Sequence, residues 1–89
     1  MLIFPVLFLS LLIRNPTFSA DLQKGEDAYD KGDYETALRE WTPLAEKGNA
    51  TAQSSLAVIY AKGQGVPQDY KTAFKWYKLA AEQGVANAQ

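Results

Sequence analysis

Two near-copies of one segment decide the fold: Asp33-Tyr34-Glu35-Thr36-Ala37, at residues 33–37, and Asp69-Tyr70-Lys71-Thr72-Ala73, at residues 69–73. The likeness continues downstream, where Ala45-Glu46-Lys47-Gly48 lies over Ala81-Glu82-Gln83-Gly84. Ten of the 21 positions from 33 to 53 are identical to the residue 36 positions later, with no gap. A period of this length is typical of helix-pair solenoids, in which each unit buries its apolar face against its neighbours.

The residues in and around these segments predict four helices. Each helix is bounded by residues that commonly stop or cap helices. The first helix covers residues 21–30, and the third covers residues 50–61. The expected caps are Asp33, Asn49 and Asp69, and the expected stops are Gly32, Gly48, Gly63 and Gly84.

Apolar residues three and four positions apart predict one buried face on each helix. In the second helix this face comprises Tyr34, Ala37, Leu38, Trp41, Leu44 and Ala45. In the third helix it comprises Ala52, Leu56, Ile59 and Tyr60, and in the fourth Tyr70, Ala73, Phe74, Tyr77, Ala80 and Ala81.

The pattern as a whole predicts an all-α protein, an α-solenoid of antiparallel helix pairs with about two repeats after an N-terminal signal peptide. Residues 21–48 form a degenerate first pair, because its joint Lys31-Gly32-Asp33 lacks five loop residues that the second pair has. Residues 49–84 form a complete repeat. Residues 85–89 resemble the start of a further repeat that is cut short.

The composition of the 89 residues excludes several kinds of chemistry. There is no Cys and no His, so disulfides, thiolate catalysis, imidazole bases and the usual zinc ligand sets are ruled out. The net charge of −1 gives no basic field for a nucleic acid, so none is expected as a partner. Hydrophobic residues make up 47% of the chain, which is enough for a folded core.

The first twenty residues have the pattern of a secretory signal peptide. Residues 2–13 are apolar apart from Pro5 and Ser10. Twelve residues rise about 18 Å as a helix, too little to cross a hydrocarbon core of about 30 Å. We expect cleavage after Ser19 or Ala20, export to the periplasm or the medium of a bacterium, and membrane contact only through this leader during export. No Lys or Arg precedes the apolar run, so an uncleaved anchor or a misplaced start stays open.

A longer motif in the second pair resembles a known family, the Sel-one-like repeat (SLR), a tetratricopeptide-like helix pair. The motif runs through Gly63-x-Gly65-Val66, Asp69-Tyr70, Trp76-Tyr77 and Ala80-Ala81. It covers residues 49–84 strongly and residues 21–48 only as a helix pair. One departure is Ala57, where the family usually has Gly. The positions that carry the repeat are Tyr60, Gly63, Gly65, Asp69, Tyr70, Ala73, Tyr77, Ala80, Ala81 and Gly84.

The resemblance implies a solenoid whose concave face binds proteins or peptides. The first helix of each pair would line that face, which makes Gln23, Glu26, Ser54 and Val58 candidate partner-binding residues. Trp76 lies one step off the buried stripe, so it is a further candidate, with core packing as the competing interpretation. The lysines Lys71, Lys75 and Lys78 share one helical face, which is commonly just solvated.

We therefore expect a non-catalytic, exported module that binds a protein or peptide, with no catalytic residue, no metal and no cofactor. Some secreted relatives with a Cys pair in every repeat are linked to β-lactam binding, but this chain has no Cys. A periplasmic hydrolase is the first alternative, although no Lys lies three residues after Ser54 or Ser55 and Ala73 follows Lys71-Thr72. A truncated piece of a longer array, without a function of its own, is the second. Self-association through the apolar C-terminal end is also expected.

Overall fold

The computed structural model describes residues 19–88, so the expected signal peptide lies outside the described residues except for Ser19 and Ala20. The described residues form four α-helices: α2 (Leu22–Asp30), α3 (Tyr34–Glu46), α4 (Ala50–Lys62) and α5 (Tyr70–Ala88). No helix among residues 19–88 has the length and apolar content that a membrane crossing needs.

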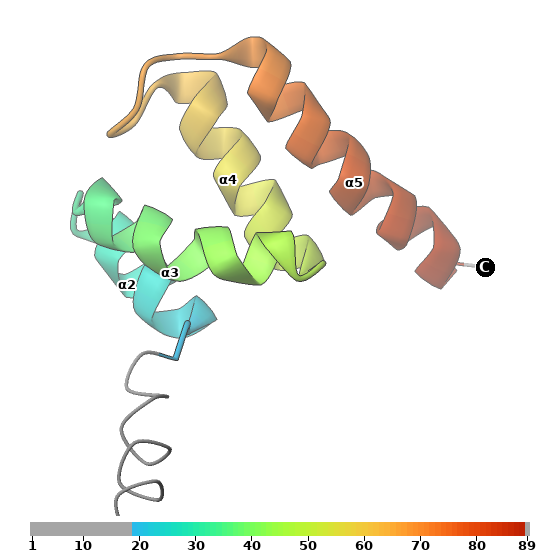
Figure 1. Cartoon of the computed structure of the whole chain (residues 1–89), viewed down its shortest axis with the longest axis horizontal. Coiled ribbons are helices and arrows are strands. Elements are labelled where there is room, and N and C mark those ends of the chain that lie inside the picture. Colours follow the sequence, from blue (N-terminus) through green and yellow to red (C-terminus); the bar gives the residue numbers. More distant parts are fainter. Residues whose placement is uncertain (1–18, 89) are drawn as a thin grey trace, which may run out of the picture.

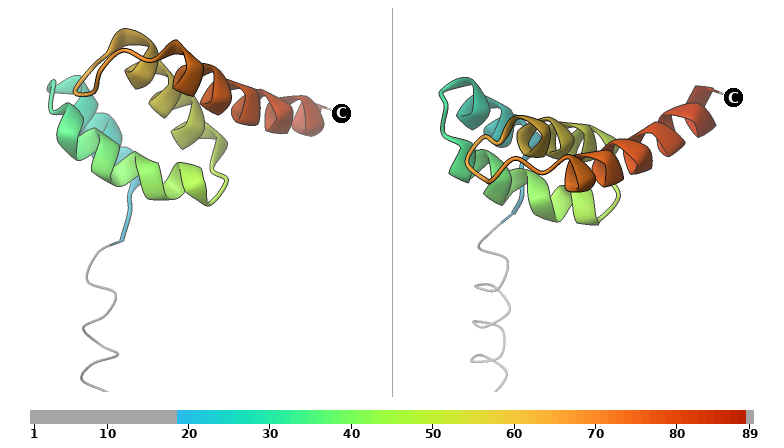
Figure 2. Two further views of the ribbon diagram at one scale, coloured as in Figure 1. Left: turned by 45° about the horizontal axis from the view of Figure 1, so that its top comes forward. Right: turned by 90° about the horizontal axis from the view of Figure 1, so that it is seen from above.

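The helices pack in sequence order, which confirms the expected all-α repeat fold. Helix α2 packs against α3, α3 against α4, and α4 against α5. Figure 1 shows the two pairs, with α4 lying between α3 and α5. Figure 2 shows that the C-terminal part of α5 projects beyond the other helices.

Side-chain caps begin all four helices, as short polar residues at these positions predict. Asp21 accepts hydrogen bonds from the backbone N–H groups of Gln23 and Lys24, and Asn49 accepts one from Ala52. Asp33 accepts from the N–H of Thr36. Asp33 is also exposed, and its bonding to Thr36 lowers its pKa below the ordinary value of 3.8.

Asp69 caps α5 through Thr72, whose hydroxyl donates to one carboxylate oxygen over 2.7 Å while its N–H donates to the other over 3.1 Å. The hydroxyl bond is the main cause that lowers the pKa of Asp69, with the backbone bond second. Because the carboxylate must be charged to accept both bonds, this cap is complete above the ordinary aspartate pKa. It weakens as the pH falls below that value.

One expected helix stop is wrong. Gly48 ends α3 in a left-handed conformation (φ 103°), but Gly84 is not among the positive-φ glycines, and α5 continues through it to Ala88. The residue after each glycine supplies the reason. Asn49 caps the next helix, whereas the matching residue is Val85, which has no side-chain acceptor. Without that cap, continuing the helix is the better way to satisfy the backbone.

The core lies between α3 and α4 and the helices on either side of them. Ala37, Trp41 and Ala45 of α3 are buried, and Tyr34, Leu38 and Leu44 are half-buried, so the predicted face of this helix is confirmed. In α4, Ala52, Leu56 and Ile59 are buried, and Tyr60 is half-buried. Ala57, which stands where the family has Gly, is also fully buried.

The predicted buried face of α5 is wrong for most of its residues. Tyr70 is 68% exposed, Phe74 67% and Tyr77 45%, and Ala81 is exposed as well. Only Ala73 is buried. The matching face of α3 is covered by α4, but among residues 19–88 no helix lies beyond α5 to cover its outer side.

One buried charge escapes a reading of the sequence. Glu40 of α3 is fully buried, and its Oε1 accepts a hydrogen bond from the N–H of Asp21 over 3.0 Å. Its Oε2 lies 3.7 Å from the Nζ of Lys24 and has no hydrogen-bond partner among the described residues. The carboxylate therefore anchors the N-terminus of α2, where a negative charge is also favourable for the helix dipole.

Replacing two glycines inside helices should change the free energy of unfolding in opposite directions. A Cβ at Gly25 would lie 2.7 Å from Cδ1 of Trp41 and 2.9 Å from Cε2, whereas a Cβ at Gly84 would have nothing within 4 Å. We expect Gly25→Ala to lower the free energy of unfolding by about 1–3 kcal/mol through overpacking. We expect Gly84→Ala to raise it by about 0.5–1 kcal/mol through helix propensity. Urea unfolding followed by circular dichroism measures both, and a loss at Gly84 would contradict the continuous helix.

Two substitutions of Glu40 distinguish the contribution of its hydrogen bond to stability from the contribution of its charge. Glu40→Ala leaves the Asp21 N–H without its partner and opens a cavity, so we expect a loss of about 2 kcal/mol. Glu40→Gln keeps an acceptor and removes a buried charge, so its stability should stay within about 1 kcal/mol of the wild type or exceed it. Thermal unfolding of the three proteins side by side provides the comparison. Equal losses in both variants would show that the charge itself is required.

Candidate functional site

A cleft of about 420 Å³ lies between α2 and α4, the first helices of the two pairs. Helix α2 contributes one wall, α4 the other, and Trp41 of α3 the back. The lining residues are Leu22, Gln23, Glu26, Tyr29, Asp30, Trp41, Thr51, Ser55 and Val58. A cleft of this size falls in the range that proteins use for small ligands or for a few side chains of a peptide.

The position of α2, and so of one cleft wall, is set by Trp41. Its ring packs where residue 25 has no side chain, and its Nε1 donates to the carbonyl of Leu22 over 3.2 Å. The ring centroid of Trp41 also lies 5.8 Å from that of Tyr29. These contacts fix two lining residues before any ligand arrives.

Tyr29 is held from three directions. Its ring meets the edge of Tyr34 with centroids 5.3 Å apart, beside the contact with Trp41. Its hydroxyl donates to Oε1 of Gln64 over 2.9 Å, and Nε2 of Gln64 donates to the hydroxyl of Tyr34 over 3.3 Å. The loop between α4 and α5 therefore supports the same wall of the cleft as α3 does.

The loop reaches this position because Gly65 lies directly against α3. A Cβ at Gly65 would come within 2.8 Å of the Cβ of Tyr34, and its φ of 78° is one that other residues rarely adopt. Gly63 ends α4 with φ 69°, and the N–H of Asp69 donates to the carbonyl of Tyr60 over 2.8 Å. The glycines of the repeat motif thus shape the loop that carries Gln64.

The cleft combines an apolar interior with an acidic edge. Leu22, Tyr29 and Val58 are half-buried and form the floor, and Trp41 behind them is 5% exposed. Glu26 and Asp30 are exposed, and no Lys or Arg belongs to the lining. Such a surface favours apolar groups carried beside positive charges.

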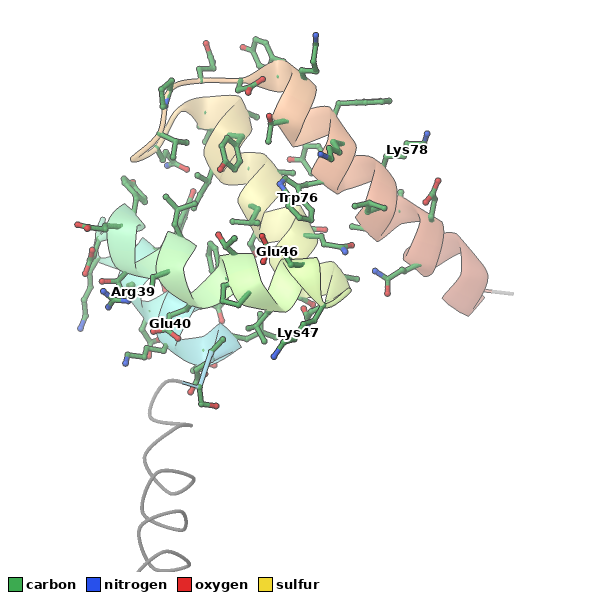
Figure 3. The ribbon with its side chains drawn as sticks, in the orientation of Figure 1. Arg39, Glu40, Glu46, Lys47, Trp76 and Lys78 are labelled. Carbon is green, nitrogen blue, oxygen red and sulfur yellow. The ribbon has the colours of Figure 1, made fainter. Side chains whose placement is uncertain are left out.

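The candidate partner-binding residues divide between two places. Gln23, Glu26 and Val58 line the cleft. Ser54 instead lines a shallower hollow of about 320 Å³ between α4 and α5, with Ala50, Thr51, Tyr77, Ala80, Ala81 and Gly84. Trp76 is half-buried, packs against the core and points from α5 toward α4, whereas Lys78 points away (Figure 3).

Six lining residues are not among the candidates from the sequence: Leu22, Tyr29, Asp30, Trp41, Thr51 and Ser55. The signal for two of them was present. Thr51, Ser55 and Val58 are spaced four and three residues apart, which places them on one stripe of α4. Ser54 lies one residue away from this stripe, which is a rotation of about 100° around a helix axis.

The charged side chains that line the cleft are carboxylates. No group of three or more Asp or Glu side chains among residues 19–88 is arranged to hold a metal ion. The exposed ionisable groups at the cleft are the two carboxylates of Glu26 and Asp30. They can attract and orient a cation.

Several known proteins are similar to parts of this chain. Residues 50–85 match the family model of the Sel1 repeat. Over 61 residues, which is 68% of this chain and 23% of the relative, it is 44% identical to an exopolysaccharide production negative regulator of Rhizobium leguminosarum bv. viciae. The corresponding regulator of Rhizobium meliloti is 39% identical over 61 residues, again 68% of this chain and 23% of the relative. An F-box protein of Arabidopsis thaliana is 33% identical over 82 residues, 92% of this chain and 22% of the relative.

The chain spans less than a quarter of the length of these relatives. No solved structure matches it. The family match covers α4, the loop and most of α5, and the Sel1 repeat is in general a module of protein–protein interaction. Residues 50–85 therefore form a Sel1 repeat.

Proposed function

We propose that this chain is an exported, non-catalytic module that binds a peptide or a segment of another protein in the cleft between α2 and α4. The observation that carries the proposal is the cleft itself, with an apolar floor of Leu22, Tyr29 and Val58 backed by Trp41. Its walls are held in place by contacts within the fold, so little ordering is needed on binding.

The charges at the cleft narrow the class of ligand. Glu26 and Asp30 stand at the edge of the floor without a basic neighbour in the lining. The cleft therefore suits a ligand that places an apolar or aromatic side chain on the floor and a Lys or Arg beside the acidic edge. The two rhizobial regulators share with this chain a stretch that is 23% of their length, so the common part is a repeat module rather than a whole regulator.

Selection from a random peptide library tests the cleft. We expect enriched peptides to pair aromatic or aliphatic residues with Lys or Arg. Val58→Arg fills the floor with a charge, so it should weaken the binding of an enriched peptide at least tenfold. Glu26→Lys should weaken it about five- to tenfold by reversing the charge of the edge. Fluorescence anisotropy with a labelled peptide measures each dissociation constant.

Glu35→Lys is the matched control for these variants, since Glu35 is exposed on α3 and does not line the cleft. It should bind the peptide within twofold of the wild type. Circular dichroism confirms that each variant is folded. Enriched peptides that bind Val58→Arg as tightly as the wild type would place the binding surface elsewhere.

Export rests on the apolar run of residues 2–13 and on the small residues Ser19 and Ala20 that follow it. Expression in a bacterium with separation of periplasm and cytosol tests this part. We expect the protein in the periplasm, with a first residue of Ala20 or Asp21. A protein that starts at Met1 in the cytosol would refute export and leave the binding proposal standing.

A further inference from the structure

Helix α5 carries a ridge of exposed aromatic side chains, and the last of them, Tyr77, also lines the hollow between α4 and α5. We define the α5 ridge as Tyr70, Phe74 and Tyr77, which are spaced four and three residues apart and are 68%, 67% and 45% exposed. Beside it lies a stripe of exposed lysines, Lys71, Lys75 and Lys78. Large aromatic side chains rarely gather on a free surface in this way, and such patches commonly mark interaction sites.

The internal repeat shows that this ridge has the form of a buried interface. Its counterparts 36 residues earlier are Tyr34, Leu38 and Trp41, which α4 and the following loop help to cover. The residues beside the ridge differ in charge between the two copies. The lysine positions of α5 correspond to Glu35, Arg39 and Thr42 on α3. The ridge therefore keeps the apolar surface of an interface and gains a positive edge.

The α2–α4 cleft has the complementary chemistry. It offers an apolar floor where the ridge offers aromatic rings, and it has Glu26 and Asp30 where the ridge has lysines. No basic residue in the cleft lining opposes the lysines. One chain thus carries both an aromatic, basic surface on α5 and a cleft of complementary chemistry between α2 and α4.

We propose that the α5 ridge of one copy docks in the α2–α4 cleft of a second copy, so that the protein associates head to tail. The proposal rests on the proposed function of the cleft and names its occupant. Such a contact uses two different surfaces, so it builds rings or open chains rather than a closed two-fold dimer. A two-fold contact between two α5 ridges is disfavoured, since antiparallel packing would bring the two lysine stripes together.

A charge-swap experiment on the full chain tests this docking. Sedimentation velocity from about 5 to 500 μM should show a mass that rises with concentration. The ridge variant Lys71→Glu/Lys75→Glu and the cleft variant Glu26→Lys/Asp30→Lys should each weaken the association at least tenfold. An equimolar mixture of the two variants should regain it, because each reversed surface then meets an opposite charge. Phe74→Ala, at an exposed position, should also weaken it several-fold without loss of helicity.

Three results would overturn the proposal. The first is a wild-type protein that remains monomeric over the whole range. The second is association that neither charge variant changes, as the apolar leader would produce. The third is a loss caused by the ridge variant alone, which would mean that α5 meets something other than the cleft. Peptide binding that Val58→Arg abolishes, in a protein that stays monomeric, would uphold the proposed function and reject only the self-docking.

Discussion

The packing of Trp41 against the bare backbone of Gly25 is the contact on which the N-terminal half of the structure depends. It lets α2 approach α3 closely enough for the indole N–H to reach the carbonyl of Leu22. The same ring supports Tyr29 and forms the back of the cleft. Core packing and the shape of the candidate site therefore depend on the same side chain.

The two copies of the repeat show that a local sequence pattern determines where a helix forms, whereas the neighbouring helices determine which of its side chains are buried. Asp33 and Asp69 cap their helices in the same way, and the segments after them are nearly identical. Tyr34 is nevertheless half-buried, while Tyr70 is 68% exposed. The first lies under the next pair of helices, and the second has only solvent outside it among the described residues. An apolar face in a repeat protein is buried only where another surface packs against it.

Local chemistry explains which features could be predicted from the sequence. The caps, the left-handed Gly48 and Gly63 and the four helices follow from short-range rules, and they are confirmed. Gly84 could not be placed the same way, because its conformation depends on whether residue 85 can cap a following helix. Glu40 looks like any surface carboxylate on α3, since only the tertiary fold brings the Asp21 N–H to it. Ser55 lines the cleft and Ser54 lines the neighbouring hollow, because packing sets the rotation of α4 about its axis.

The position of Glu40 also shows that the two pairs hold their first helix in different ways. Its counterpart 36 residues later is Trp76, which packs on the core from α5. Helix α2 has nine residues, a length at which an isolated helix is marginal, whereas α4 has thirteen. The shorter helix is tied at its N-terminus by the carboxylate of Glu40, while the longer one buries enough apolar surface to use an indole at the matching place. A carboxylate in the first pair and an indole in the second thus occupy matching positions of the repeat.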